Sequence, residues 1–341
     1  ERKRGRDVRK IVGIDIGEDS VKMLYCVSGE LKKAVVVETP DNMVGQGRIL
    51  SMDAMGGFLR ETAKSHGIPL TNAALVLPSA KMFTRVMTVP AMTEQQLKYN
   101  LPYEFRDFLT EEKSKYFFDY SVRSIVRDEN GAPKEMELLA CAMLKQEVED
   151  YRAMLRRAGF KLKELAPLEC AYEALVDVDE LSGEDLCIVY VGQQSSHLYI
   201  YHDGAFDSHR SIETCLNELD ELIGEHCSVD VHVARSYRRT NYNNVLASDY
   251  ARALYNRLGL EVVKAVNFYN YNNRGRELQN VYVCGGDGDM TTALSVISQN
   301  EKLHLHRAET LIPDELLPEE DARLYLGAAG VICEGIRGGV K

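Results

Sequence analysis

The sequence contains no tryptophan, no low-complexity tract and no run of about 18 apolar residues. The missing apolar run argues against a membrane-spanning helix, and the first residues lack the apolar stretch that a secretory signal needs. We therefore expect a cytoplasmic protein. A content of 45% hydrophobic and 27% charged residues is typical of a folded globular chain and indicates no disorder.

Positive charge is also scarce, because 41 Lys and Arg are outnumbered by 52 Asp and Glu, for a net charge of -11. Nucleic-acid backbones are held mainly by Lys and Arg, so this balance excludes a general nucleic-acid binder. The exception is the basic tail of residues 1–10, which contains six Lys or Arg. This tail either touches an anionic membrane surface or is a solvated segment, and we assign it no role.

Cys-x-x-Cys pairs are absent. The eight cysteines are scattered, and several lie in apolar runs where a free thiol behaves as a small hydrophobic side chain. Reduced core thiols are the interpretation that this pattern favours. His226, Cys227 and His232 lie near one another in the chain, but they match no standard zinc spacing, so we assign them no metal site.

The sequence does contain a regular alternation of apolar runs and tight turns. A length of 341 residues predicts two or more lobes. A three-stranded meander is expected over residues 11–38, followed by a helix over residues 52–66. The segment from Ala73 to Gly159 then predicts a compact inserted subdomain with the order β-β-α-β-β-α.

The second half of the chain repeats the first. Residues 186–212 have the pattern of a second meander, and its turn residues match those of the first at one constant offset of 175 residues, as Gly17 with Gly192, Ser20 with Ser195, and Gly29 with Gly204. Duplicated β-β-β units predict a two-lobed α/β fold with a nucleotide between the lobes. We expect a basic tail at residues 1–10, a first lobe at 11–72 and 160–182, the inserted subdomain at 73–159 and a second lobe at 183–341.

The first hairpin carries residues suited to a phosphate. Asp15 lies in an apolar strand, where a buried carboxylate needs a partner such as hydrated Mg2+. Gly17 lets the backbone approach a phosphate, the Ser20 hydroxyl can donate a hydrogen bond, and Lys22 supplies positive charge on the same strand face as Ser20. The alternative is that Asp15 caps the turn and Lys22 faces solvent.

A glycine-rich turn follows the apolar strand predicted at residues 280–284. Gly285, Gly286 and Gly288 stand between this strand and a predicted helix, which brings backbone N–H groups close to a nucleotide. Such a cluster is also typical of an ordinary strand-to-helix turn, and the internal repeat is what favours ligand contact. In the repeated hairpin, the corresponding candidates for nucleotide contact are Gly192, Gln193 and Ser195.

Together these features resemble the type IV pilus assembly protein PilM family of the actin-like ATPase superfamily, which is related to the cell-division protein FtsA. The motifs that carry the resemblance are the Ile-Val-Gly-Ile-Asp-Ile-Gly opening with Ser20-Val21-Lys22, the inserted subdomain and the Gly285-Gly286-x-Gly288 turn. The resemblance implies an actin-like (ribonuclease H-like, duplicated) two-lobed α/β fold. It also implies ATP and Mg2+ as cofactors, with Asp15 holding the metal through water.

The same resemblance implies a cytoplasmic scaffold at the inner face of the cell membrane, in type IV pilus or related secretion machinery. Such a scaffold holds the cytoplasmic tail of a PilN-like inner-membrane protein and is peripheral to the membrane through that partner. Self-association is left open. The candidate partner groove is an aromatic-rich stretch that includes Tyr99, Leu101, Tyr103 and Phe105, and the alternative is that this stretch packs into its own subdomain.

One position departs from the superfamily pattern. The second phosphate hairpin usually carries Asp where this chain has Tyr190, and a phenol cannot serve as a second carboxylate for a metal-bound water. We therefore expect nucleotide binding with weak or absent ATP hydrolysis, with Gln193 or Gln194 as side chains able to orient a water. The alternatives are an FtsA-like membrane-associated filament protein and a phosphotransferase, which needs a carboxylate base near the transferred phosphate.

Overall fold

The computed structural model describes residues 10–45, 47–78, 81–176, 184–273, 275–286, 290–300 and 302–338. Most of the predicted basic tail and Gly288 lie outside these ranges. The chain divides into two compact units, Glu1–Ala171 with Val331–Lys341, and Tyr172–Gly330. Among the described residues, no helix has the length and apolar character needed to cross a membrane.

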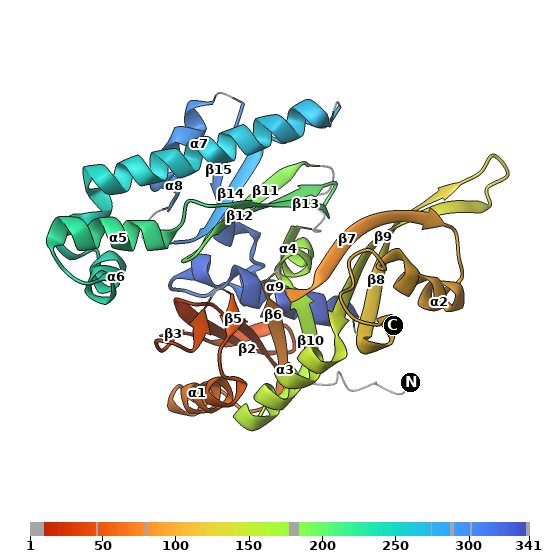
Figure 1. Cartoon of the computed structure of the whole chain (residues 1–341), viewed down its shortest axis with the longest axis horizontal. Helices are drawn as coiled ribbons and strands as arrows, with labels where there is room; N and C mark the ends of the chain where they lie inside the picture. The colour runs from red at the N-terminus through yellow and green to blue at the C-terminus, as the bar shows by residue number, and fades with distance from the viewer. Residues whose placement is uncertain are drawn as a thin grey trace, which may run out of the picture. The chain divides into compact units, whose positions relative to one another are not determined.

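The first unit is built on a five-stranded sheet in the order β10-β6-β1-β2-β3 (Figure 1). The first three strands form the predicted antiparallel meander, and β6 and β10 extend it with parallel pairing. The strands are β1 (Lys10–Ile16), β2 (Ser20–Val27), β3 (Glu30–Glu38), β6 (Asn72–Leu77) and β10 (Lys161–Pro167). A two-stranded ribbon of β4 (Val44–Gly45) and β5 (Arg48–Ile49) follows the meander.

Helices cover the sheet of the first unit. The helices α1 (Met52–Ser65) and α3 (Lys145–Ala158) pack together and bury Met55, Leu59 and Leu155 against the strands. A second apolar cluster includes Ala171 of α4 (Leu168–Val176) and Val331 of α9 (Leu326–Gly338). The strand β6 contributes to both clusters and is buried from Ala73 to Leu77, as expected of a central parallel strand that is covered on both faces.

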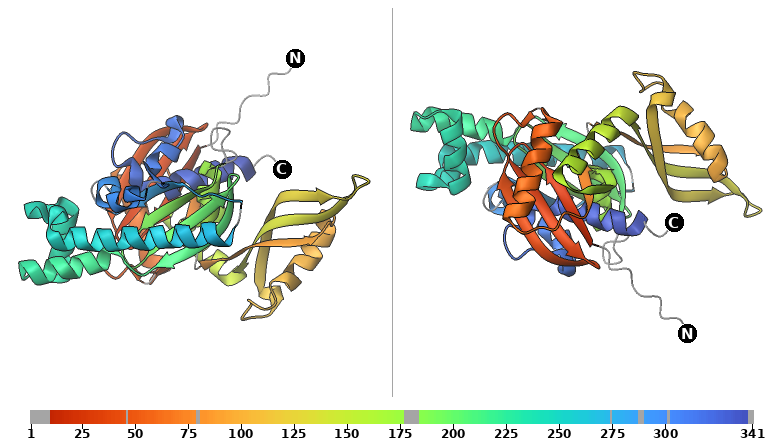
Figure 2. Two further views of the ribbon diagram at one scale, coloured as in Figure 1. Left: turned by 90° about the horizontal axis from the view of Figure 1, so that it is seen from above. Right: turned by 90° about the horizontal axis from the view of Figure 1, so that it is seen from below.

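The inserted subdomain has its own three-stranded sheet in the order β7-β9-β8, with α2 packed on it. Its elements are β7 (Phe83–Pro90), α2 (Glu94–Glu104), η2 (Lys113–Lys115), β8 (Tyr116–Arg127) and β9 (Pro133–Leu144). The β8–β9 hairpin projects beyond α2 (Figure 2). Two elements of the predicted β-β-α-β-β-α unit pack elsewhere in the first unit. The first strand, β6, pairs with β1 and β10, and the last helix, α3, packs against α1.

The second unit repeats the topology of the first. Its five-stranded sheet has the order β13-β12-β11-β14-β15, so that a meander is again followed by two parallel strands. The strands are β11 (Leu186–Val191), β12 (Ser196–His202), β13 (Ala205–Ile212), β14 (Asn280–Gly285) and β15 (His304–Arg307). Asp15 pairs with Lys22 in the first hairpin and Tyr190 with His197 in the second, so the repeat extends to strand register.

Helices of the second unit form a large apolar core with its sheet. The main ones are α5 (Leu216–Cys227), α6 (Val231–Thr240) and α7 (Asp249–Asn272), and shorter ones are η3 (Tyr242–Ala247), α8 (Met290–Ala293), η4 (Ser295–Gln299), η5 (Ala308–Leu311), η6 (Asp314–Leu316) and η7 (Ala322–Leu324). The long α7 begins where the Ser248 hydroxyl accepts a hydrogen bond from the Ala251 N–H (3.2 Å). It buries Leu254, Leu258 and Val262 at helical spacing.

Candidate functional site

The first hairpin brings Asp15 and Lys22 together. The Lys22 Nζ lies 3.9 Å from the Asp15 Oδ2, and the exposed fractions of the two side chains are only 6% and 19%. Lys22 therefore does not face solvent. Burial raises the pKa of the Asp15 carboxyl, and the nearby Lys22 ammonium opposes this rise. The hairpin thus holds a fixed positive charge directly beside its turn.

The turn of this hairpin is held by backbone and by one buried side chain. The Gly17 N–H donates to the Ser20 carbonyl (3.0 Å), and the Thr39 hydroxyl donates to the Gly17 carbonyl (2.8 Å). A Cβ at Gly17 would lie 3.2 Å from the Lys22 Nζ, so glycine leaves room for the ammonium. Thr39 was not identified from the sequence. The one local signal was its hydroxyl, directly after the predicted third strand. Ser20 begins β2 and is partly buried.

Tyr190 stands in the second hairpin at the place that Asp15 has in the first. Its ring and that of His197 have centroids 6.5 Å apart and are nearly parallel, at 20°. A Cβ on Gly192 would meet the Tyr190 ring at 2.9 Å, and one on Gly285 would meet it at 3.2 Å. The ring therefore fills the space beside both glycine turns, and an aromatic surface replaces the carboxylate of the first hairpin.

Gln193 belongs to the same turn, but its side chain points into the second unit and is buried. Its Nε2 donates to the Asp220 Oδ2 (2.7 Å), and its Oε1 accepts a hydrogen bond from the Arg238 Nη2 (2.9 Å). The Arg238 Nε also donates to the Asp220 Oδ1 (2.5 Å), and neither charged side chain has any exposed surface. Both ends of the Gln193 amide are thus engaged within the protein, so the expectation that this side chain orients a water is wrong. The Gln193 backbone carbonyl also accepts a hydrogen bond, from the Asn217 N–H (2.9 Å).

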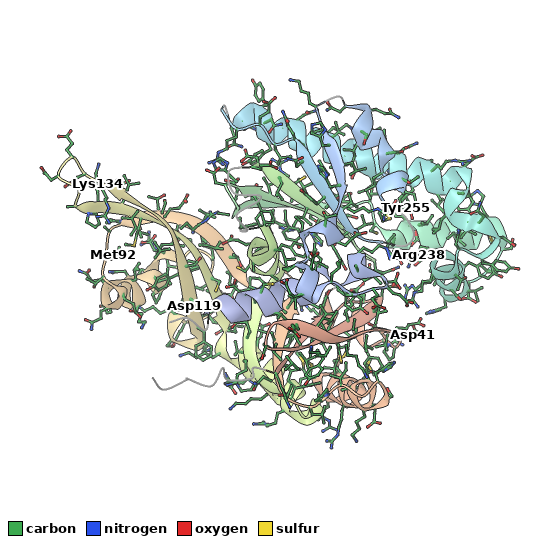
Figure 3. All side chains as sticks on the ribbon, turned by 180° about the vertical axis from the view of Figure 1, so that it is seen from behind. Asp41, Met92, Asp119, Lys134, Arg238 and Tyr255 are labelled. Carbon is green, nitrogen blue, oxygen red and sulfur yellow. The ribbon has the colours of Figure 1, made fainter. Side chains whose placement is uncertain are left out.

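Asp220 and Arg238 were not found from the sequence, although one signal was present. Asp220 lies on the face of α5 that buries Leu216, Leu219 and Ile223, so a carboxylate replaces an apolar residue in that stripe. Figure 3 labels Arg238 in the second unit, with Tyr255 of α7 nearby. The network joins the turn of the second hairpin to α5 and α6.

The second glycine turn follows β14. Gly285 and Gly286 have φ angles of +74° and +64°, in the region that favours glycine. The Gly286 N–H donates to the Val191 carbonyl (2.9 Å), which ties this turn to the end of β11. Two of the three predicted glycines are thus placed next to the second hairpin.

The candidate partner groove separates into two classes of residue. Leu101 of α2 and Phe105, the residue that directly follows this helix, have exposed fractions of 2% and 0% and belong to the core of the inserted subdomain. Tyr99 and Tyr103 are 70% and 45% exposed, and their ring centroids are 5.9 Å apart. The Lys113 ammonium lies 3.5 Å from the centre of the Tyr103 ring. A partner can therefore reach only the two tyrosines of this set.

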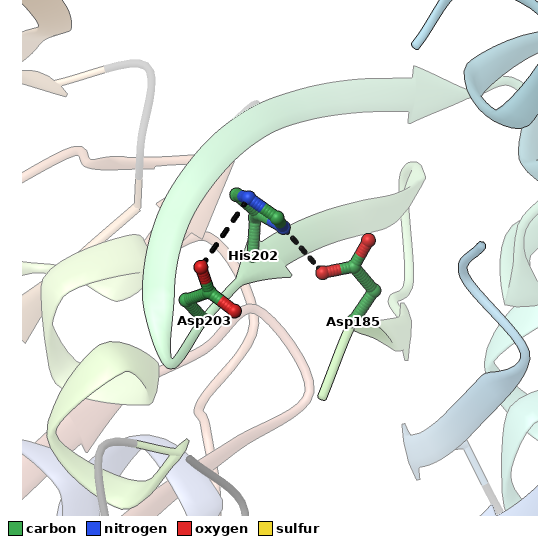
Figure 4. Close-up of side chains that lie close together, drawn as sticks. All are labelled: Asp185, His202 and Asp203. Atoms are coloured by element: carbon green, nitrogen blue, oxygen red, sulfur yellow. Dashed lines mark hydrogen bonds and ion pairs between the residues drawn. The ribbon is translucent and has the colours of Figure 1, made fainter. Parts of the chain in front are cut away.

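A further polar cluster lies at the start of β11 and at the β12–β13 turn. His202 stands between two carboxylates, with its Nδ1 bonded to the Asp185 Oδ1 and its Nε2 3.5 Å from the Asp203 Oδ2 (Figure 4). Among the described residues, it is the one group of three or more His, Cys, Asp and Glu whose ligand atoms all lie within 4.8 Å of one another. Because both imidazole nitrogens already face carboxylates, the polar groups of this cluster find their partners within it.

Comparison with known protein families decides where this duplicated fold belongs. Residues 13–311 match the family described as type IV pilus assembly protein PilM. The chain belongs to the PilM family. A comparison with curated proteins finds no match.

Solved structures place this PilM-family chain in the actin-like ATPase fold, as predicted. A PilM-PilN type IV pilus biogenesis complex superposes with a TM-score of 0.73 at 16% identity, over 96% of this chain and 99% of that one. The ethanolamine utilization protein EutJ from Carboxydothermus hydrogenoformans has a TM-score of 0.60 at 12% identity, over 95% and 89%. MreB5 of Spiroplasma citri, bound to ADP, has a TM-score of 0.50 at 13% identity, over 97% and 99%.

Proposed function

We propose that this PilM-family chain is a nucleotide-binding scaffold of type IV pilus or related secretion machinery. It binds ATP with Mg2+, hydrolyses ATP slowly or not at all, and holds the cytoplasmic tail of a PilN-like protein at the inner face of the membrane. The observation that carries this proposal is the unequal pair of hairpins. A buried lysine stands beside the first turn, and Tyr190 replaces the carboxylate of the second.

The residues of the first hairpin fit a phosphate. Lys22 offers an ammonium, Gly17 leaves the space that a Cβ would fill, and the Asp15 carboxylate can hold a metal-bound water. A bound Mg2+ would neutralise phosphate charge. The turns at Gly192 and at Gly285 and Gly286 are the proposed contacts from the second unit. With Tyr190 beside them, they lack the carboxylate that a phosphotransferase or a fast hydrolase uses as its base.

Lys22→Met is expected to raise the Kd for ATP with Mg2+ by about 10- to 100-fold, because a charge-assisted hydrogen bond to phosphate is lost. Isothermal titration calorimetry gives the Kd, and a phosphate-release assay on wild type gives the turnover. Lys32→Met is the matched control, since Lys32 lies on β3 in an exposed pair with Glu30.

The single variant Lys22→Met leaves the buried Asp15 carboxylate without its partner, which can itself disturb the hairpin. The double variant Asp15→Asn with Lys22→Met removes both charges, so any change in its Kd does not come from an unpaired carboxylate. Thermal unfolding of each variant shows whether the fold is kept. An unchanged Kd in both variants would remove Lys22 from the proposed site. Rapid turnover by wild type would overturn the role given to Tyr190.

The proposed partner surface is the pair of exposed tyrosines on α2. Its support is membership of the PilM family and the similarity to a chain of a PilM-PilN complex. Tyr99→Ala with Tyr103→Ala is expected to weaken binding of a peptide from the PilN partner's cytoplasmic tail by about tenfold or more, since aromatic anchors dominate such interfaces.

Fluorescence anisotropy with a labelled tail peptide measures this affinity. Tyr271→Ala is the control, because Tyr271 is 77% exposed on α7 of the other unit. If the α2 variant binds the peptide as tightly as wild type does, the partner binds elsewhere and the two tyrosines are excluded. Sedimentation analysis of the same samples measures whether the protein self-associates.

A further inference from the structure

Three side chains of the second unit form a hydrogen-bonded chain that starts at the predicted phosphate turn. The Ser195 Oγ lies 2.9 Å from the His197 Nε2, and the His197 Nδ1 lies 3.0 Å from the His209 Nε2. Ser195 precedes β12, His197 lies on β12 and His209 on β13. A hydroxyl, a first imidazole and a second imidazole are therefore connected in order, as in sites where a base activates a nucleophile and a third group orients the base.

Aromatic rings fix the two imidazoles in place. The His197 ring is nearly parallel to the rings of Tyr190 and His209, whose centroids lie 6.5 Å and 5.1 Å away. The His209 ring lies 4.9 Å from that of Tyr199, which is buried. Tyr190 thus has a structural consequence beyond the loss of a carboxylate, since its ring positions the imidazole that bonds Ser195.

The two imidazoles must be neutral if one of them is to accept a proton. Burial and then the neighbouring His209 lower the pKa of His197 to about 4, and burial lowers the pKa of His209. Both rings are therefore neutral at pH 7. A neutral His197 can donate its Nδ1–H to the His209 Nε2, which leaves a lone pair on Nε2 to accept the Ser195 hydroxyl proton.

We propose that Ser195 is a phosphoryl acceptor, with His197 as its general base and His209 as the residue that positions His197. This inference rests on the proposed binding of ATP. The Ser195 Oγ attacks the terminal phosphorus of ATP, a bond forms between that oxygen and phosphorus, and the bond from phosphorus to the bridging oxygen breaks to release ADP. The hydroxyl proton moves to the His197 Nε2, while the hydrogen bond between the His197 Nδ1 and the His209 Nε2 keeps the ring in position.

The first hairpin provides an internal comparison. Ser20 corresponds to Ser195 and Lys22 to His197 at the same offset, but an ammonium paired with Asp15 has no lone pair to accept a proton. The two hairpins therefore differ in chemistry: the first carries a positive charge that suits phosphate, and the second carries a neutral base that can take the Ser195 hydroxyl proton. Phosphorylation is expected on Ser195 and not on Ser20.

The experiment incubates the full chain with ATP and Mg2+ and follows the addition of one phosphoryl group by intact mass, with the site assigned by peptide mapping. ATP binding is measured separately by calorimetry. A second readout needs no nucleotide, because a fluorophosphonate probe labels a serine that a neighbouring base activates. Labelled Ser195 in both assays is the expected result.

Two variants test the roles of the histidines. His197→Gln is expected to lower both labelling rates by about 100-fold or more, since a general base typically supplies that factor. His209→Gln lies outside the turn and is expected to lower them by at least about tenfold while the Kd for ATP is unchanged. His304→Gln, at an exposed position on β15, is the control and should label as wild type does.

The outcomes separate the two proposals. Tight ATP binding without phosphate on Ser195 overturns the acceptor role and leaves the scaffold intact. No ATP binding at any concentration overturns the proposed nucleotide function, and the acceptor role with it. Labelling of Ser195 at the same rate in the His197→Gln variant would remove the base from the mechanism.

Discussion

Replacing Arg238 with leucine is expected to lower the free energy of unfolding by about 3–5 kcal/mol, because a buried carboxylate is left without its partner. Asp220 and Arg238 are both fully buried, and the arginine holds the Asp220 Oδ1 and the Gln193 Oε1 at once. Arg235 contacts the other carboxylate oxygen at 3.3 Å but is partly exposed, so it compensates incompletely. Chemical denaturation in urea, monitored by circular dichroism, measures the change.

Two further variants give this prediction its controls. Arg252→Leu removes an exposed arginine that pairs with Asp249 three residues before it on α7, and it should change stability by about 1 kcal/mol or less. Asp220→Leu combined with Arg238→Leu removes both buried charges, and it should recover much of the loss. If Arg238→Leu is no more destabilising than Arg252→Leu, the network makes no net contribution to the fold.

The Arg238 network also connects stability with the site. Asp220 and Arg238 hold the Gln193 side chain, so loss of Arg238 frees one end of its amide in the turn that carries Gly192 and Ser195. The Arg238→Leu variant is therefore expected to weaken ATP binding under conditions in which it is still folded. The double Leu variant separates a general loss of fold from this local loosening of the turn.

Gly285→Ala is expected to lower the free energy of unfolding by about 3 kcal/mol or more, from two separate causes. Gly285 has a φ of +74°, where a side chain costs about 1–2 kcal/mol. A Cβ there would also lie 2.5 Å from the Val191 carbonyl oxygen, which is backbone and cannot rotate away. The turn must open, and with it the hydrogen bond from the Gly286 N–H to Val191.

Gly29→Ala isolates the first cause from the second. Gly29 has a φ of +90°, but no atom lies within 4 Å of the position that its Cβ would take. This control should lose only about 1–2 kcal/mol. Thermal or urea unfolding of both variants gives the difference, and equal losses would show that the close approach of Gly285 to Val191 has no energetic role.

Some features of the fold follow from local patterns in the chain. The alternation of apolar residues and the paired turns predicted both meanders, and the constant offset predicted that the second repeats the first. The structure adds that the repeat extends to strand register, as the pairs Asp15–Lys22 and Tyr190–His197 show. These features are recoverable because strand alternation and hairpin turns depend on residues near one another in sequence. The actin-like fold was implied by the resemblance of this ordered set of motifs to the PilM family.

The extent of the inserted subdomain was harder to predict. Strand β6 and helix α3 border the insertion in sequence, yet both pack in the lobe. Their apolar residues indicate burial but not the partner, since a parallel strand pairs with segments far away in the chain. The same limit applies to residues 99–105, where Leu101 and Phe105 are buried and Tyr99 and Tyr103 are exposed, because tertiary packing decides which side chains face the subdomain core.

The sequence by itself therefore determined the duplicated hairpins, the glycine turns and the exchange of a carboxylate for Tyr190. Only the tertiary structure placed Lys22 in a buried pair with Asp15, directed Gln193 inward to Asp220 and Arg238, and brought His209 to the imidazole beside Ser195. The physical reason is the range of the interactions. Strand and turn patterns act between neighbours along the chain, whereas buried charges and hydrogen-bonded side chains find partners that only the packing of distant elements brings within reach.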